Sequence, residues 1–177
     1  MSAEDDHLTR KLARFIRVGR VKALNPEKHT ARVLFEADDS LSYELPVLVH
    51  NTYANHDYVM PDLEDDVVCV FLPDGPEDGF VIGSFYAGEV TPPAASEDLR
   101  RVRFQDGTTV TYNRASHDLD VVIEGTHIHA NRQRVDVTTP VSVNVNTNGN
   151  ISLNASGNIA IQAGGAITIN GASVSIN

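Results

Sequence analysis

The chain has 177 residues and a formal net charge of −10 at pH 7, so it fits one domain or two small ones, and we expect no nucleic-acid binding through phosphate contacts. No apolar stretch approaches the ~18–20 residues of a membrane-spanning helix, and the first residues lack the basic and apolar regions of a secretory signal. The single cysteine, Cys69, excludes an intramolecular disulfide and lies in an apolar run, which predicts a buried strand thiol.

The N-terminal segment, residues 1–17, predicts a short amphipathic helix. Ser2 and Asp5 resemble a capping box. Apolar residues then follow at helical spacing over roughly residues 4–16, at Leu8, Leu12, Phe15 and Ile16.

Residues 18–90 have the pattern of short strands separated by turns rich in Pro, Asp and Asn. The five predicted strands are Ile16–Leu24, Thr30–Glu36, Tyr43–Val49, Asp66–Leu72 and Gly79–Phe85. Five short strands in such a length favour a small closed barrel of the OB-fold type. The predicted loops are acidic and aromatic residues are sparse, so we expect no nucleic-acid binding by this barrel.

Residues 91–98 predict a linker, because Pro and Ala dominate the stretch around them. After it, Val102–Phe104 and Thr108–Tyr112 flank Gln105-Asp106-Gly107, which is a strong hairpin turn signal.

The region from Leu119 to Asn177 repeats every eight residues. An apolar pair recurs at one fixed position, in Leu119/Val121, Val135/Val137, Val143/Val145, Ile151/Leu153, Ile159/Ile161 and Ile167/Ile169. A glycine lies two residues before the pair position in several repeats, at Gly125, Gly149, Gly157 and Gly165. Short repeated strands with glycine corners indicate a β-helix or a related solenoid.

At one position of this eight-residue repeat, His127 and His129 stand in place of the apolar pair. Residues i and i+2 of a strand share a face, so the octad phase predicts that both imidazoles lie on the apolar face.

A single chain of octads supplies too few apolar residues to close a core by itself. Three chains about one axis, each adding one short strand per layer, would enclose a triangular core of Val, Ile and Leu. We therefore expect an obligate homotrimer with an intertwined triple-stranded β-helix over residues 99–177. The alternative is an unstructured tail rich in Asn and Ser, against which the strict octad phase argues.

Several segments in order resemble one known family. They are Leu12–Val21, Leu45–Leu48, Asp65–Val68, Gly79–Tyr86, Phe104–Thr108 and the octad tail. Together they resemble the phage baseplate assembly protein V, or central spike, family of contractile tails, over nearly the whole chain. The resemblance implies an OB-fold collar and a trimeric β-helical needle that perforates the outer membrane of the target bacterium. It also implies a location in the tail baseplate of the virion, with the baseplate hub and tail tube proteins as partners.

Three chains would bring six imidazoles of His127 and His129 to the axis, a set suited to iron, nickel or zinc. Members of the resembled family carry such an H-x-H iron site, typically near the C-terminal apex, whereas His129 lies well before the end of this chain. The alternative is that the histidines are hydrogen-bonded within the prism or turned outward, in which case Ile128 would face inward.

We predict no enzymatic activity, because no nucleophile elbow, P-loop or zinc-finger spacing is present. From Val137 onward the chain has no Asp, Glu, Lys or Arg, which would lower the cost of driving a shaft through a bilayer. After Ile169 the apolar phase slips, to Val174 and Ile176. A type VI-like or R-type bacteriocin spike with a separate tip or effector protein is therefore the second interpretation.

Overall fold

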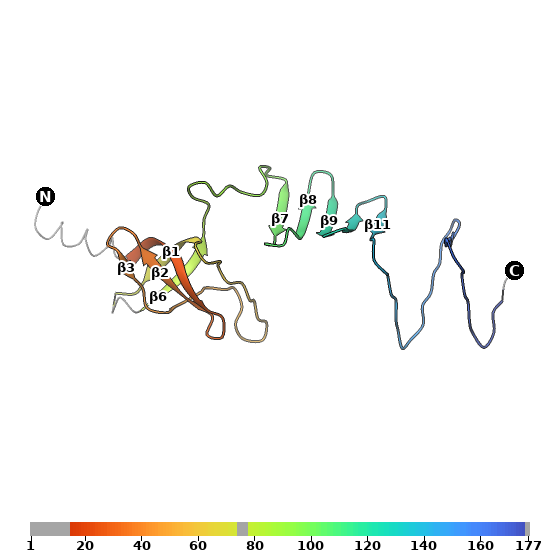
Figure 1. The fold of residues 1–177 in the computed structure, drawn as a ribbon, viewed down its shortest axis with the longest axis horizontal. Coiled ribbons are helices and arrows are strands. Elements are labelled where there is room, and N and C mark those ends of the chain that lie inside the picture. The colour runs from red at the N-terminus through yellow and green to blue at the C-terminus, as the bar shows by residue number, and fades with distance from the viewer. Residues whose placement is uncertain (1–14, 74–77, 176–177) are drawn as a thin grey trace, which may run out of the picture.

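The computed structural model describes residues 15–73 and 78–175, and every regular element assigned in these residues is a β-strand (Figure 1). The strands form two sheets with antiparallel pairing, one after the other along the chain. The all-β class predicted from the sequence is confirmed for the described residues. No helix among them is long and apolar enough to cross a bilayer. Most of the predicted helix falls on residues 1–14, outside the described residues, and its predicted end at residue 17 is wrong because a strand begins at Ile16.

The N-terminal sheet has the strand order β3-β2-β1-β5-β6, and β4 pairs with β2 beside β3. Its strands are β1 (Ile16–Asn25), β2 (Thr30–Phe35), β3 (Ser40–Leu41), β4 (Leu45–Pro46), β5 (Asp66–Phe71) and β6 (Gly79–Ser84). Four of the five predicted strands are confirmed, because β1, β2, β5 and β6 match them to within one residue at each end.

The predicted strand Tyr43–Val49 is wrong, because two short strands, β3 and β4, stand on either side of Ser42. The buried Ser42 hydroxyl accepts the Val33 N–H at 2.8 Å, a bond that a backbone carbonyl would accept in a regular ladder. It also donates to the Tyr43 carbonyl at 2.7 Å. A side chain that replaces the backbone in this way interrupts the strand.

The core of this sheet follows from alternation along β2 and β5. Every second residue is buried, and the core consists of Val21, Ala31, Val33, Phe35, Leu45, Val67, Cys69, Phe71 and Val81. Phe35 and Phe71 meet edge to face at 5.7 Å, the arrangement that aromatic quadrupoles prefer. The predicted burial of Cys69 is confirmed. Burial raises the pKa of its thiol to about 11.

The strand pairing forms no closed barrel within the described residues, so the predicted closure is not found. The segment that follows β4 pairs with β6 at an isolated parallel bridge between Val47 and Val81, and the Leu48 N–H donates to the Val81 carbonyl at 2.8 Å. The N-terminal sheet therefore has one short backbone contact between this segment and β6.

The C-terminal sheet is an antiparallel meander in the order β11-β10-β9-β8-β7. Its strands are β7 (Leu99–Arg103), β8 (Thr109–Asn113), β9 (Asp118–Ile123), β10 (Thr126–Ala130) and β11 (Val135–Thr138). The hairpin predicted at Gln105-Asp106-Gly107 is confirmed, because Arg103 pairs with Thr109 across it and Gly107 has a positive φ of 87°.

The octads adopt two different structures. The first ones form β9, β10 and β11 within one chain, whereas residues 139–175 carry no assigned strand and extend away from the sheets (Figure 1). The described part of a single chain therefore contains no β-helix. The apolar residues of its extended segment are more than half exposed, as at Val145, which is 71% exposed, and Leu153, which is 70% exposed.

Candidate functional site

The C-terminal sheet has one apolar and one polar face. Directly opposed residues of an antiparallel sheet point to the same side, so the register assigns each side chain to a face. One side, here called the apolar face, carries two rows across the five strands: Val102, Val110, Val121, Ile128 and Val137, then Arg100, Tyr112, Leu119, Ala130 and Val135. Its large apolar side chains are exposed to different degrees: Val121 is partly buried, Ile128 is 37% exposed and Val135 is 71% exposed.

The opposite side, here called the polar face, carries the two alternate rows. These are Arg101, Thr111, Asp120, His129 and Asp136, then Arg103, Thr109, Val122, His127 and Thr138. Both candidate histidines therefore lie on the polar face, among acidic and hydroxyl side chains.

The prediction that His127 and His129 share the apolar face with the octad pairs is wrong. The turn between β9 and β10 contains only Glu124 and Gly125, so Val121 pairs with Ile128 and not with a histidine. Glu124 has a φ of 49°, as expected in a tight two-residue hairpin turn. The alternative in which Ile128 takes the apolar side is the one that this register confirms.

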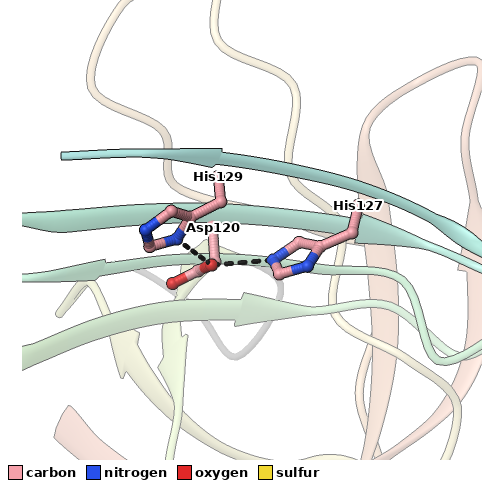
Figure 2. A group of neighbouring side chains, drawn as sticks. All are labelled: Asp120, His127 and His129. Atoms are coloured by element: carbon pink, nitrogen blue, oxygen red, sulfur yellow. Dashed lines mark hydrogen bonds and ion pairs between the residues drawn. The ribbon is translucent and has the colours of Figure 1, made fainter. Parts of the chain in front are cut away.

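The polar face brings both histidines to one carboxylate, that of Asp120 (Figure 2). His127 Nε2 lies 2.8 Å from Asp120 Oδ1, and His129 Nδ1 lies 2.8 Å from the same oxygen. His129 is the direct cross-strand partner of Asp120, and His127 reaches it diagonally from two residues along β10. Sequence reasoning missed Asp120. The Glu124-Gly125 turn was the signal that could have found it, because a two-residue hairpin pairs positions 120 and 129.

A second carboxylate, that of Asp118 at the start of β9, supports this cluster. Asn131 Nδ2 donates to Asp118 Oδ1 at 3.2 Å and also lies 3.2 Å from His129 Nε2. The Asn131 side chain is fixed because its Oδ1 accepts the backbone N–H groups of Gln133 and Arg134 at 2.9 and 3.1 Å. Since an amide nitrogen only donates, His129 Nε2 is the acceptor, and its Nδ1 carries the proton that bonds Asp120.

The electrostatics of the cluster favour charged carboxylates. Hydrogen bonds from His129 and then His127 hold the pKa of Asp120 below its usual range. Hydrogen bonds from Ser116 and Asn131 likewise lower the pKa of Asp118. Asp136, the cross-strand partner of His129, forms an ion pair with Arg134 at 2.8 Å. The site therefore presents two imidazoles beside an ionised carboxylate.

This arrangement could hold a metal ion. One ligand atom from each of Asp120, His127 and His129 lies within 4.8 Å of the other two, and no other such group of His, Cys, Asp or Glu is found among the described residues. Imidazole nitrogen and carboxylate oxygen are ligands of divalent transition metals. The predicted axial set of six imidazoles needs both histidines on the face of the octad pairs, whereas both lie on the opposite face of this sheet.

The other histidines are apart from this cluster. His29 and His117 occupy turns with positive φ, His50 is nearly fully exposed, and His56 belongs to an exposed loop. His7 lies outside the described residues. Comparison with known proteins adds no assignment: no protein-family model and no curated protein matches this chain. The family resemblance stays a prediction from the residues.

Proposed function

We propose that this chain is the homotrimeric central spike of a contractile tail and perforates the outer membrane of a target bacterium. The observation that carries the proposal is an apolar surface that one chain leaves uncovered. The apolar face of the C-terminal sheet and the apolar octad pairs of residues 139–175 are both exposed in the single chain. Val135 and Val137 keep the eight-residue phase of the apolar pairs in the tail, so the two apolar surfaces follow one sequence repeat.

Association of three copies of the same chain would best bury these two apolar surfaces. The tail has no charged residue from Val137 onward, so copies can approach in register without like-charge repulsion. Each octad adds only one apolar pair, which suits a core shared among several thin chains. In this proposal the tail residues form an intertwined triple-stranded β-helix, and folding of this part depends on assembly.

The N-terminal sheet supports the proposed OB-fold collar. In the order of pairing, β1 joins β2 and β5, β5 joins β6, and the Val47–Val81 bridge links the segment after β4 to β6 in parallel. A five-stranded barrel whose first predicted strand pairs on both sides would have this connectivity, which supports the proposed collar. The collar would attach the spike to the baseplate hub and tail tube proteins.

The uncharged tail is the part suited to piercing. Each charge carried into hydrocarbon costs about 2.5–3.5 kcal/mol even on lenient scales. Asn, Ser and Thr keep the shaft hydrated beforehand. We expect that lysines placed at Asn146 and Asn154 reduce killing or infection by assembled particles. Unchanged killing with normal particle yield would refute the piercing role of the uncharged shaft.

The assignment to a tail is tested on particles. An N-terminally tagged chain is expected in purified contractile particles, at three copies each and at the baseplate end in labelled electron micrographs. Absence from intact particles would overturn the proposal. A second candidate, a type VI-like or R-type bacteriocin spike with a separate tip protein, is favoured by the slip of apolar phase to Val174. Particles without a capsid, or co-purification of a tip protein, would select it.

A further inference from the structure

We infer that each chain holds its own divalent transition-metal ion on the polar face of the C-terminal sheet, with Asp120, His127 and His129 as ligands. The site lies within one β-strand pair and does not depend on the trimer. It differs from an axial site in its third ligand, in its face of the sheet and in its stoichiometry of one ion per chain.

The backbone places the three ligands before any ion binds. Asp120 belongs to β9 and both histidines belong to β10, and the two strands pair continuously from Leu119–Ala130 to Ile123–Thr126. The two-residue turn at Glu124-Gly125 fixes this register. Only side-chain torsions then remain to be ordered when a metal binds, which lowers the entropic cost of binding.

The ligand atoms lie close to the spacing that a metal needs. With bonds of about 2.0–2.2 Å, a tetrahedral ion holds its ligand atoms about 3.3–3.6 Å apart. Asp120 Oδ1 is now 2.8 Å from each imidazole nitrogen, and all three atoms lie within 4.8 Å of one another. Insertion of an ion therefore opens these two contacts by about 0.5–0.8 Å, which small side-chain rotations achieve.

The surroundings favour a cation and supply an outer partner. Asp118 Oδ1 lies 3.7 Å from His129 Nε2, and Asp136, which is paired with Arg134, is the cross-strand partner of His129. A metal on Nδ1 leaves the imidazole proton on Nε2, where the Asp118 carboxylate replaces Asn131 as its partner. Carboxylate partners of this kind orient metal-bound histidines.

The donor set selects the class of ion. Two imidazole nitrogens and one carboxylate oxygen suit Zn²⁺, Fe²⁺, Co²⁺ or Ni²⁺ better than Ca²⁺ or Mg²⁺, which prefer oxygen ligands. His127 is 48% exposed, so water can take the remaining coordination positions. An ion held here joins β9 to β10 next to the start of the octad tail.

The test is Co²⁺ titration of the chelator-treated full chain, read by d–d absorption and by direct metal analysis. We expect one Co²⁺ per chain, and a loss of affinity well above 100-fold in His127→Gln and in Asp120→Asn. His50→Gln is the matched control, since that side chain is nearly fully exposed and is not part of the ligand group, and this variant should bind Co²⁺ normally. Circular dichroism verifies that each variant retains its strands.

Three outcomes overturn the inference. They are no binding, one ion for every three chains with Asp120→Asn unaffected, or equal loss in the His50→Gln control. The oligomeric mass is measured on the same samples. A trimer without metal refutes this site and leaves the proposed spike intact, whereas a metal-loaded monomer does the reverse.

Discussion

Substitution of Val137 by Asn tests whether the apolar face is a contact between copies. Val137 is 59% exposed in the single chain, and full burial of such a side chain contributes about 1.5–3 kcal/mol. Burial of the exposed three-fifths therefore contributes ~0.9–1.8 kcal/mol per chain and ~3–5 kcal/mol per trimer. Since 1.4 kcal/mol corresponds to a tenfold change in an association constant, Val137→Asn should weaken trimer association by roughly 10²- to 10⁴-fold.

The assay is sedimentation velocity over a dilution series, and the neighbouring Thr138→Asn is the matched control. Thr138 pairs with His127 and lies on the polar face, so its variant should sediment like the parent protein. The reasoning is refuted if Val137→Asn dissociates no more readily than the parent, or if Thr138→Asn has the same effect as Val137→Asn.

Three further predictions concern the two sheets. Gly19→Ala should destabilise the N-terminal sheet by about 1–3 kcal/mol in urea unfolding, because a Cβ there would lie 2.5 Å from the Leu34 carbonyl, whereas Gly164→Ala, with open space, should not. Equal effects would contradict the packing. The pKa of Asp120 is lower in the folded than in the unfolded protein, so its ionised carboxylate stabilises the fold. This stabilisation is complete at pH values above the unfolded-state pKa of about 3.9 and is lost as the pH falls through the folded-state pKa. In metal-free protein, Asp120→Asn should therefore lower Tm at pH 7, with a difference that shrinks below about pH 4; a constant difference would contradict the linkage. The Cys69 thiol, buried and with its pKa raised to about 11, should react with Ellman's reagent at pH 8 only after unfolding, and rapid reaction of the folded protein would contradict its burial.

Sequence reasoning predicted the N-terminal strands well where short apolar runs end at turn residues. Strands β2 and β5 bury every second residue, but residues 67–71 of β5 are all apolar, so the sequence indicates the strand and not which of its faces is buried. The break at Ser42 was missed, because it arises when the Ser42 hydroxyl, in place of a backbone carbonyl, accepts the N–H of Val33, nine residues earlier. A side-chain acceptor in place of a backbone carbonyl does not change the hydrophobic pattern of the sequence.

The candidate site was predicted in part, for a related reason. Both histidines were identified, but their face and their carboxylate partner were not. The octad prediction assumes that odd-numbered residues lie on the apolar face in every strand. After the two-residue Glu124-Gly125 turn, the even-numbered residues of β10 lie on that face instead. The four-residue connection from β10 to β11 returns the odd-numbered residues to that face, because Ala130 pairs with Val135. The histidine pair therefore lies on the opposite face from the apolar pairs on either side of it.

The most direct test of the proposed spike is the native mass of the purified full chain in solution. Light scattering coupled to size exclusion at micromolar concentration should give about 58 kDa, three times the 19.2 kDa of one chain. A mass of 19.2 kDa under these conditions would leave the apolar face and the octad tail uncovered, and would contradict the trimeric spike.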